Sequence, residues 1–303
     1  MTPAMTERDS ETHRTTRAVI GPARAPELHI MSWNIRRRMP RVLARSADRW
    51  CRRAPGITAL LTTERPTVLC AQEVLPDQLG ALYEGLGRGY HHVGFGRSAD
   101  GGGEACPIMY DADRLELEGW EQSALSDTPR LPGSTSWGNP FPRILVGARF
   151  RDRATSRRIH VMNTHLDPFS ARSRLRAAVA IGDLVGPGEP PTVLAGDLNA
   201  GPSSDAVRAL FAAGLVDSWD GARSRATGEW GTYGRYRRPR RHGDRIDWIL
   251  TSSRLRVTQA AINPFRHGGW PSDHLPVQAV VRTESPSGPS GPSGPVVAGA
   301  GPL

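Results

Sequence analysis

Short apolar runs, separated by glycine, proline and polar clusters, fill the chain between residues 27 and 284. Apolar runs of about four to eight residues bounded by turn residues predict buried strands. We therefore expect strands at residues 28–35, 67–73, 91–96, 104–110, 143–150, 159–167, 192–195, 245–250 and 277–281.

Helical spacing of apolar residues is found between some of these runs. We predict helices over residues 46–61 and 76–86, one between residues 167 and 191, and one that begins at Ser203 or Ser204 and ends near Phe211. Pro55 and Gly56 should interrupt or restart the first of them. Many strands with few helices favour two packed sheets with helices outside over a doubly wound parallel sheet.

Polar side chains follow several of the predicted strands. The run 192–195 leads into Gly196, Asp197, Leu198 and Asn199. Because side chains alternate along a strand, Asp197 and Asn199 point the same way if the chain stays extended past Gly196. A carboxylate and an amide placed so suit a cation and a phosphoryl oxygen, whereas the simpler alternative is an ordinary Asx-type turn.

The two ends of the chain differ from this block. Residues 1–26 lack periodicity and are expected to be disordered, and residues 285–303 repeat Pro, Ser and Gly as flexible tails do. No stretch has transmembrane length, and the start has no apolar signal-peptide core. The three cysteines, which have no metal-ligand spacing, are expected to be reduced and mostly buried. These features predict a cytoplasmic protein with one folded domain at residues 27–284.

The positive net charge of the chain favours an anionic partner, such as nucleic acid or a phosphorylated substrate. The formal net charge is +9, and all 39 basic residues are arginine, which also indicates a compositional bias. Five of them stand close together in a loop before residue 245: Arg235, Arg237, Arg238, Arg240 and Arg241. This loop suits the backbone of a nucleic acid, although an arginine-biased mobile surface loop explains it equally well.

The residues at the strand ends suit the hydrolysis of a phosphate ester, which requires charge neutralisation and an oriented water. Glu73 is the best candidate ligand for a hard cation such as Mg²⁺, with Asn34 and Asp273 in a similar role. His165 and His274 have the chemistry of an acid, a base or a phosphate contact.

Six short motifs, taken in order, resemble the endonuclease/exonuclease/phosphatase superfamily. They are Asn34, Gln72-Glu73, Asn163-Thr164-His165, Gly196-Asp197-Leu198-Asn199, Arg245-Ile246-Asp247 and Ser272-Asp273-His274. Each motif is weak alone, but the ordered set covers nearly the whole block. The resemblance implies a four-layer α/β/β/α sandwich of two mixed β-sheets flanked by helices, and cleavage of phosphodiesters or phosphomonoesters with Mg²⁺ or Mn²⁺.

The resemblance also implies a role for each motif residue. Glu73 would bind the metal, with Asn34 and Asp273 nearby. Asp197 and Asn199 would orient the attacking water and bind the phosphate.

Two acid–histidine pairs complete the implied site. Asp247 would steady His274, which would act on the nucleophile or the phosphate. His165 would contact the scissile phosphate or assist the leaving group, with Glu104 as its partner. Weaker candidates for phosphate contacts are Tyr110 and Arg143.

Three functions stay open at this point. The first is a metal-dependent phosphodiesterase of nuclease type. The second is a hydrolase of a small phosphorylated metabolite or a lipid headgroup, and the third is a catalytically silent member that binds an anion. The intact set of acids and histidines argues against the third, and a monomer is assumed because the sequence does not indicate an oligomeric state.

Overall fold

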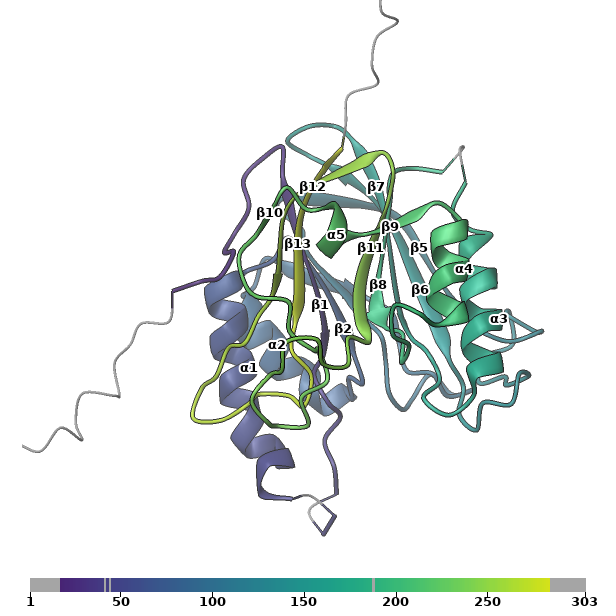
Figure 1. The fold of residues 1–303 in the computed structure, drawn as a ribbon, viewed down its shortest axis with the longest axis horizontal. Helices are drawn as coiled ribbons and strands as arrows, with labels where there is room; N and C mark the ends of the chain where they lie inside the picture. Colours follow the sequence, from purple (N-terminus) through teal and green to yellow (C-terminus); the bar gives the residue numbers. More distant parts are fainter. Residues whose placement is uncertain (1–16, 41, 44, 187–188, 284–303) are drawn as a thin grey trace, which may run out of the picture.

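Two β-sheets pack face to face at the centre of the protein, and helices cover their outer faces (Figure 1). This computed structural model describes residues 17–40, 42–43, 45–186 and 189–283. The predicted four-layer sandwich of two mixed sheets is confirmed. In the described part of the chain, one sheet has seven strands and the other has six.

The seven-stranded sheet has the order β10-β12-β13-β1-β2-β4-β3. Its strands are β1 (Leu28–Asn34), β2 (Val68–Gln72), β3 (Tyr90–Val93), β4 (Ile108–Asp111), β10 (Ser224–Arg225), β12 (Leu255–Ile262) and β13 (Val277–Thr283). β1 and β2 run parallel, with Asn34 opposite Gln72. The carboxyl ends of both strands therefore lie at the same edge of the sheet.

The six-stranded sheet has the order β5-β6-β7-β8-β11-β9. Its strands are β5 (Leu115–Ala124), β6 (Ile144–Asp152), β7 (Arg158–His165), β8 (Thr192–Asp197), β9 (Leu215–Asp217) and β11 (Asp247–Ser252). β7 and β8 are parallel and end on the pair His165 and Asp197. β11 is antiparallel to β8 and begins with Asp247 opposite Asp197.

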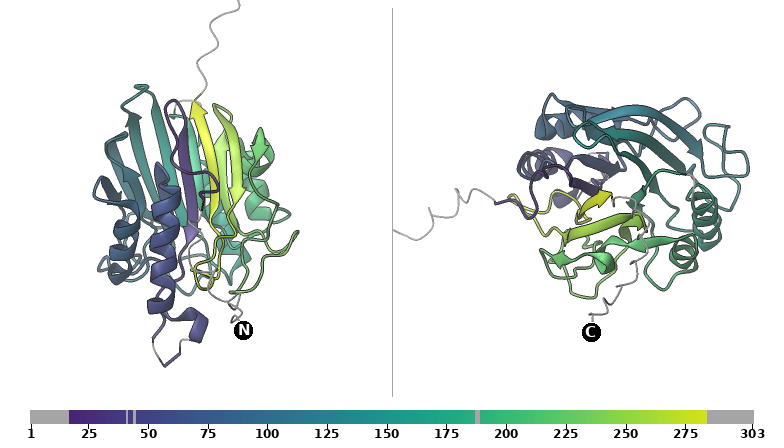
Figure 2. Two further views of the ribbon diagram at one scale, coloured as in Figure 1. Left: turned by 90° about the vertical axis from the view of Figure 1, so that its left-hand side faces the viewer. Right: turned by 90° about the horizontal axis from the view of Figure 1, so that it is seen from above.

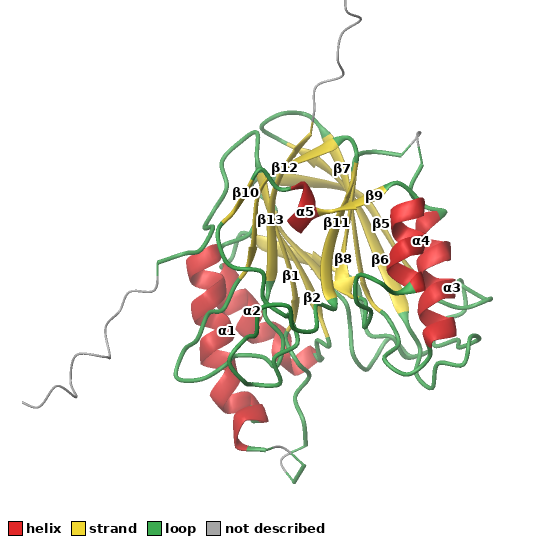
Figure 3. Cartoon of the chain, viewed as in Figure 1, coloured by secondary structure: helices red, strands yellow, loops and turns green. Residues whose placement is uncertain are grey.

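Helices lie on both outer faces of the sandwich (Figures 2 and 3). They are α1 (Trp50–Glu64), α2 (Leu79–Leu86), α3 (Ala171–Gly182), α4 (Asp205–Ala212) and the short α5 (Ser218–Gly221). α1 and α2 cover the seven-stranded sheet, and α3 and α4 cover the other sheet. Ser204 caps α4 by accepting a hydrogen bond from the N–H of Val207, as predicted. None of the helices in the described ranges is long and apolar enough to cross a membrane.

The expected break at Pro55 and Gly56 is wrong, since α1 continues through both residues. A proline inside a helix removes one backbone hydrogen bond. The buried face of α1, which includes Ile57, Leu60 and Leu61, packs into the core and offsets this loss. Gly56 lies against Pro271, where a Cβ would come within 2.9 Å of the proline ring. The glycine thus permits the close approach of the helix.

Residues 17–26, which fall within the predicted disordered extension, lie against the folded block. The N–H groups of Val19, Ile20 and Gly21 donate to the buried Glu64 carboxylate at 2.7, 3.1 and 2.9 Å. The same carboxylate accepts from Asn263. Residues 1–16 and the predicted tail at residues 285–303 lie outside the described part of the chain.

Candidate active site

Ends of strands from both sheets meet at one edge of the sandwich. The side-chain amide of Asn34, at the end of β1, donates to Asp197 Oδ2 at 3.0 Å and to Glu73 Oε1 at 3.1 Å. Asp197 ends β8 in the opposite sheet. All three residues are buried. One amide therefore joins the two sheets at the predicted catalytic edge.

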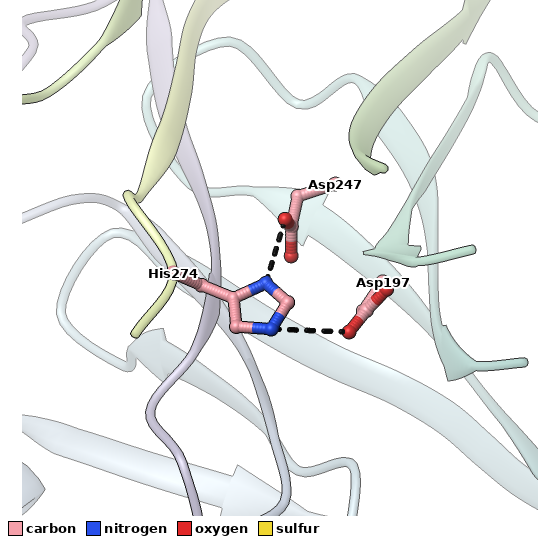
Figure 4. Close-up of side chains that lie close together, drawn as sticks. All are labelled: Asp197, Asp247 and His274. Atoms are coloured by element: carbon pink, nitrogen blue, oxygen red, sulfur yellow. Dashed lines mark hydrogen bonds and ion pairs between the residues drawn. The ribbon is translucent and has the colours of Figure 1, made fainter. Parts of the chain in front are cut away.

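Asp247 and Asp197 flank His274 (Figure 4). Nδ1 of His274 lies 2.8 Å from Asp247 Oδ2, and Nε2 lies 3.8 Å from Asp197 Oδ2. Burial alone would lower the pKa of His274, but the two carboxylates outweigh burial and hold this pKa well above its ordinary value. His274 is therefore a cation at neutral pH. The predicted pairing of His274 with Asp247 is present in the structure.

His165 has the opposite electrostatic state. Burial lowers the pKa of His165 to about 4, and the positive charge of Arg143 adds to this effect against the pull of Asp197. Nε2 of His165 lies 3.5 Å from Asp197 Oδ2. Asp197 thus faces one neutral and one cationic imidazole. Burial, together with the negative charge of Asp247, raises the pKa of Asp197.

Glu73 is held in its ionised form. Burial alone would raise its pKa, but His165, Arg36, the N–H of Arg37 and the amide of Asn34 outweigh burial and lower this pKa to about 2. The N–H of Arg37 lies 3.0 Å from Glu73 Oε2. A carboxylate that stays charged at any physiological pH suits a metal ligand.

The oxygens around Glu73 fit a hard divalent cation. Carboxylate and amide oxygens of Glu73, Asp273 and Asn34 are the ligand types that Mg²⁺ and Mn²⁺ take in proteins. Another group in the described residues, Asp197, Asp247 and His274, has ligand atoms within 4.8 Å of one another. In that group, Nδ1 of His274 and Asp247 Oδ2 already engage each other at 2.8 Å. The residues around Glu73 fit the cation better.

Asn199 does not continue the strand beside Asp197. β8 ends at Asp197, and Asn199 has a φ of +46°. The backbone N–H of Asn199 donates to Asp197 Oδ1 at 3.0 Å, and its side-chain amide donates to the carbonyl of Leu166 at 3.0 Å. The turn alternative therefore describes this backbone, and the turn holds the carboxylate of Asp197 in place.

Glu104, which was expected to pair with His165, has other partners. Glu104 pairs with Arg97 at 3.0 Å and with Arg37 at 3.5 Å, so its partners are arginines and not the expected His165.

Of the two candidates for phosphate contacts, Arg143 lies near the site and Tyr110 does not. Arg143 is buried beside Asp167 at 3.4 Å, and its Nη1 has no hydrogen-bond partner among the described residues. A buried guanidinium nitrogen near His165 suits a phosphate oxygen. Tyr110 packs on Phe150 with ring centroids 4.8 Å apart, inside the core between the sheets, and does not join the site.

Arg36 and Tyr233 stand at the site and were missed from the sequence. The guanidinium of Arg36 lies 3.6 Å from Glu73 and 3.8 Å from Asp273. The ring of Tyr233 lies 4.7 Å from that of His274. The arginine run that directly follows the strand of Asn34 was a usable signal for Arg36, whereas the sequence offered none for Tyr233.

Residues 31–274, from β1 to the last predicted catalytic histidine, match the model of the Endonuclease/Exonuclease/phosphatase family. The chain belongs to this family. The resemblance noted in the six motifs is thereby confirmed, and the enzymes of the family act on phosphate esters.

Solved structures and curated relatives agree with this assignment. A family protein from Bacteroides thetaiotaomicron superposes with a TM-score of 0.79 at 26% identity, over 86% of this chain and 98% of that one. A mannosyl-6-phosphatase from the same organism superposes with a TM-score of 0.76 at 26% identity, over 84% of this chain and 99% of that one. Nocturnin of Drosophila melanogaster is 24% identical over 212 residues, 62% of this chain and 31% of that protein. The chain spans less than two thirds of the curated relatives it matches.

Proposed function

We propose that the protein is a Mg²⁺- or Mn²⁺-dependent phosphodiesterase of nuclease type. The observation that carries the proposal is the position of Asp197, whose carboxylate lies 3.5 Å from a neutral His165 and 3.8 Å from a cationic His274. Such a carboxylate can take a proton from water while the cationic imidazole holds the phosphate. Glu73 would hold the metal, which supplies charge neutralisation of the phosphate.

The arginine-rich loop supports a polyanionic substrate. Arginines line a cavity of about 470 Å³ that also includes Tyr233. Tyr233 pairs with His274 through an isolated β-bridge, so the cavity adjoins the catalytic centre. Arg235, Arg237, Arg238, Arg240 and Arg241 are all exposed. Guanidinium groups along such a loop suit successive phosphates of a nucleic-acid backbone.

A phosphomonoesterase acting on a small phosphorylated metabolite is the second candidate. The similarity in fold and sequence to a mannosyl-6-phosphatase favours it. The same catalytic centre serves either substrate, because each requires an oriented water and a neutralised phosphate.

Hydrolysis assays separate the two candidates. The purified protein with Mg²⁺ or Mn²⁺ is given plasmid DNA, RNA, a chromogenic phosphodiester and a phosphomonoester. We expect Asp197→Ala and His274→Ala to lower kcat/KM by about 10³-fold, because each removes a group that acts in the transition state. No hydrolysis of any substrate, or unchanged variants, would contradict the proposed enzyme.

Salt dependence then tests the arginine loop. For a nucleic-acid substrate, the double variant Arg237→Gln with Arg238→Gln should weaken binding and reduce the salt slope by about two phosphate contacts. Arg172→Gln with Arg208→Gln, exposed arginines on α3 and α4, is the charge-matched control. Activity on small esters alone, insensitive to salt, would favour the phosphomonoesterase.

A further inference from the structure

A cavity of about 280 Å³ lies on the outer face of the six-stranded sheet. Its floor comes from β5, β6 and β7, and α3 and the chain between β5 and β6 form its walls. Apolar side chains dominate the lining: Trp137, Leu145, Met162, Ala180 and Leu184. Met162 packs in the cluster under α3, whereas Val161 faces the other sheet. The cavity is therefore separate from the catalytic edge.

His160, on β7, contributes its ring to the cavity. The residue is 2% exposed, and neither ring nitrogen has a hydrogen-bond partner among the residues that the structure describes. Gly147 on the neighbouring strand makes room for the ring, since a Cβ there would lie 3.0 Å from Nε2. Buried polar side chains normally have partners, because an unpaired donor or acceptor costs free energy.

The imidazole of His160 is neutral at physiological pH. Burial lowers its pKa to about 4, and Arg149 adds to that effect while Glu189 opposes it. A neutral imidazole offers one N–H donor and one acceptor nitrogen. Glu121, an exposed residue of the lining, pairs with Arg149 at 3.7 Å, so the two charges offset each other and the cavity favours an uncharged ligand.

We propose that this cavity binds a small uncharged aromatic molecule whose single polar group forms a hydrogen bond with His160. The apolar walls, with the flat ring of Trp137 among them, suit an aromatic ligand. A cavity of about 150 Å³ holds one benzene ring. The larger volume here therefore accepts two fused rings.

Indole and indene are the probes for this site. They have nearly the same shape, but only indole carries an N–H. Isothermal titration of the full chain should give an indole affinity about fivefold above that of indene, the usual size of one neutral hydrogen bond. Indole should also shift the NMR signals of the His160 ring in the unmodified protein. Absence of binding by both probes, an unmoved His160 signal or equal affinities would overturn the proposal.

Two variants locate the ligand. Ala180→Phe fills the cavity from a half-buried position on α3, and both probes should bind at least about tenfold more weakly. Val179→Phe, the next residue on the same helix and 49% exposed, is the matched control and should bind as the unmodified protein does.

His160→Phe keeps the ring and removes its nitrogens. The preference for indole over indene should vanish in this variant, while indene still binds. A preserved preference, or full binding by a folded Ala180→Phe variant, would show that the ligand lies elsewhere.

Discussion

Arg36 places a positive charge among the carboxylates of the catalytic edge. Its guanidinium lies 3.6 Å from Asp48, 3.6 Å from Glu73 and 3.8 Å from Asp273. These carboxylates raise the pKa of Arg36 above its ordinary value despite burial, so the positive charge is permanent. Arg36 therefore shares Glu73 and Asp273 with any divalent cation bound to them.

Removal of that charge should strengthen metal binding. We expect Arg36→Gln to bind Mg²⁺ or Mn²⁺ about tenfold more tightly, because a nearby like charge no longer opposes the ion. Isothermal titration of metal into the metal-free protein measures this directly. Arg38→Gln is the control, since Arg38 pairs with the exposed Asp77. Unchanged affinity in Arg36→Gln would place the cation away from Glu73.

The sequence indicated the chemistry of single residues better than their partners. Asn34, Glu73, Asp197, Asp247 and His274 meet as the motifs implied. Glu104 instead pairs with Arg97, because both lie in the loop between β3 and β4, where the N–H of Arg97 also donates to the carbonyl of Glu104 at 3.0 Å. Side-chain pairing within a loop depends on the path of its backbone, which a linear pattern does not contain.

At the scale of the elements, the strands that were missed lack a continuous apolar run. β5 carries polar side chains along most of its length and is largely exposed. β9 and β10 have only three and two residues. The strands that were predicted, such as β1, β2 and β8, are buried along their whole length. Burial on both faces creates the clearest signal, and β5, β9 and β10 lack it.

Gly196 couples β8 to β7 at the catalytic edge. A Cβ at this residue would lie 2.2 Å from the backbone oxygen of Thr164 on β7. Gly196→Ala should therefore force the strands apart, lower the free energy of unfolding by about 2 kcal/mol and reduce activity through Asp197. Urea unfolding measures the first effect.

The control for this variant is Gly201→Ala, because no heavy atom of the described residues, apart from Gly201 and its two chain neighbours, lies within 4 Å of a Cβ there. Equal stability of the two variants would mean that β7 and β8 adjust without strain.

The whole molecule buries several histidines in their neutral form. Burial, outweighing nearby carboxylates where these are present, lowers the pKa of His29, His160 and His165 from 6.5 to about 4. Between these two pH values the unfolded chain binds more protons than the folded one. The share of the stability that these three histidines contribute is therefore complete above pH 6.5 and is lost as the pH falls towards 4.

His160→Phe should remove the contribution of His160 to this loss of stability at low pH. The decrease in unfolding free energy between pH 7 and pH 4.5 should be smaller by about 2 kcal/mol than in the unmodified protein. Urea unfolding at both pH values gives the difference. An identical decrease in the variant would show that His160 titrates normally in the fold.

The amide of Asn34, which bonds Glu73 in its own sheet and Asp197 in the other, makes the two sheets dependent on each other for more than stability. Each sheet alone is a closed set of backbone hydrogen bonds, and a small slide of one past the other would leave both intact. It would nevertheless separate the groups at the shared edge. Catalytic competence is thus a property of the alignment between the sheets, and it can be lost while every strand remains formed.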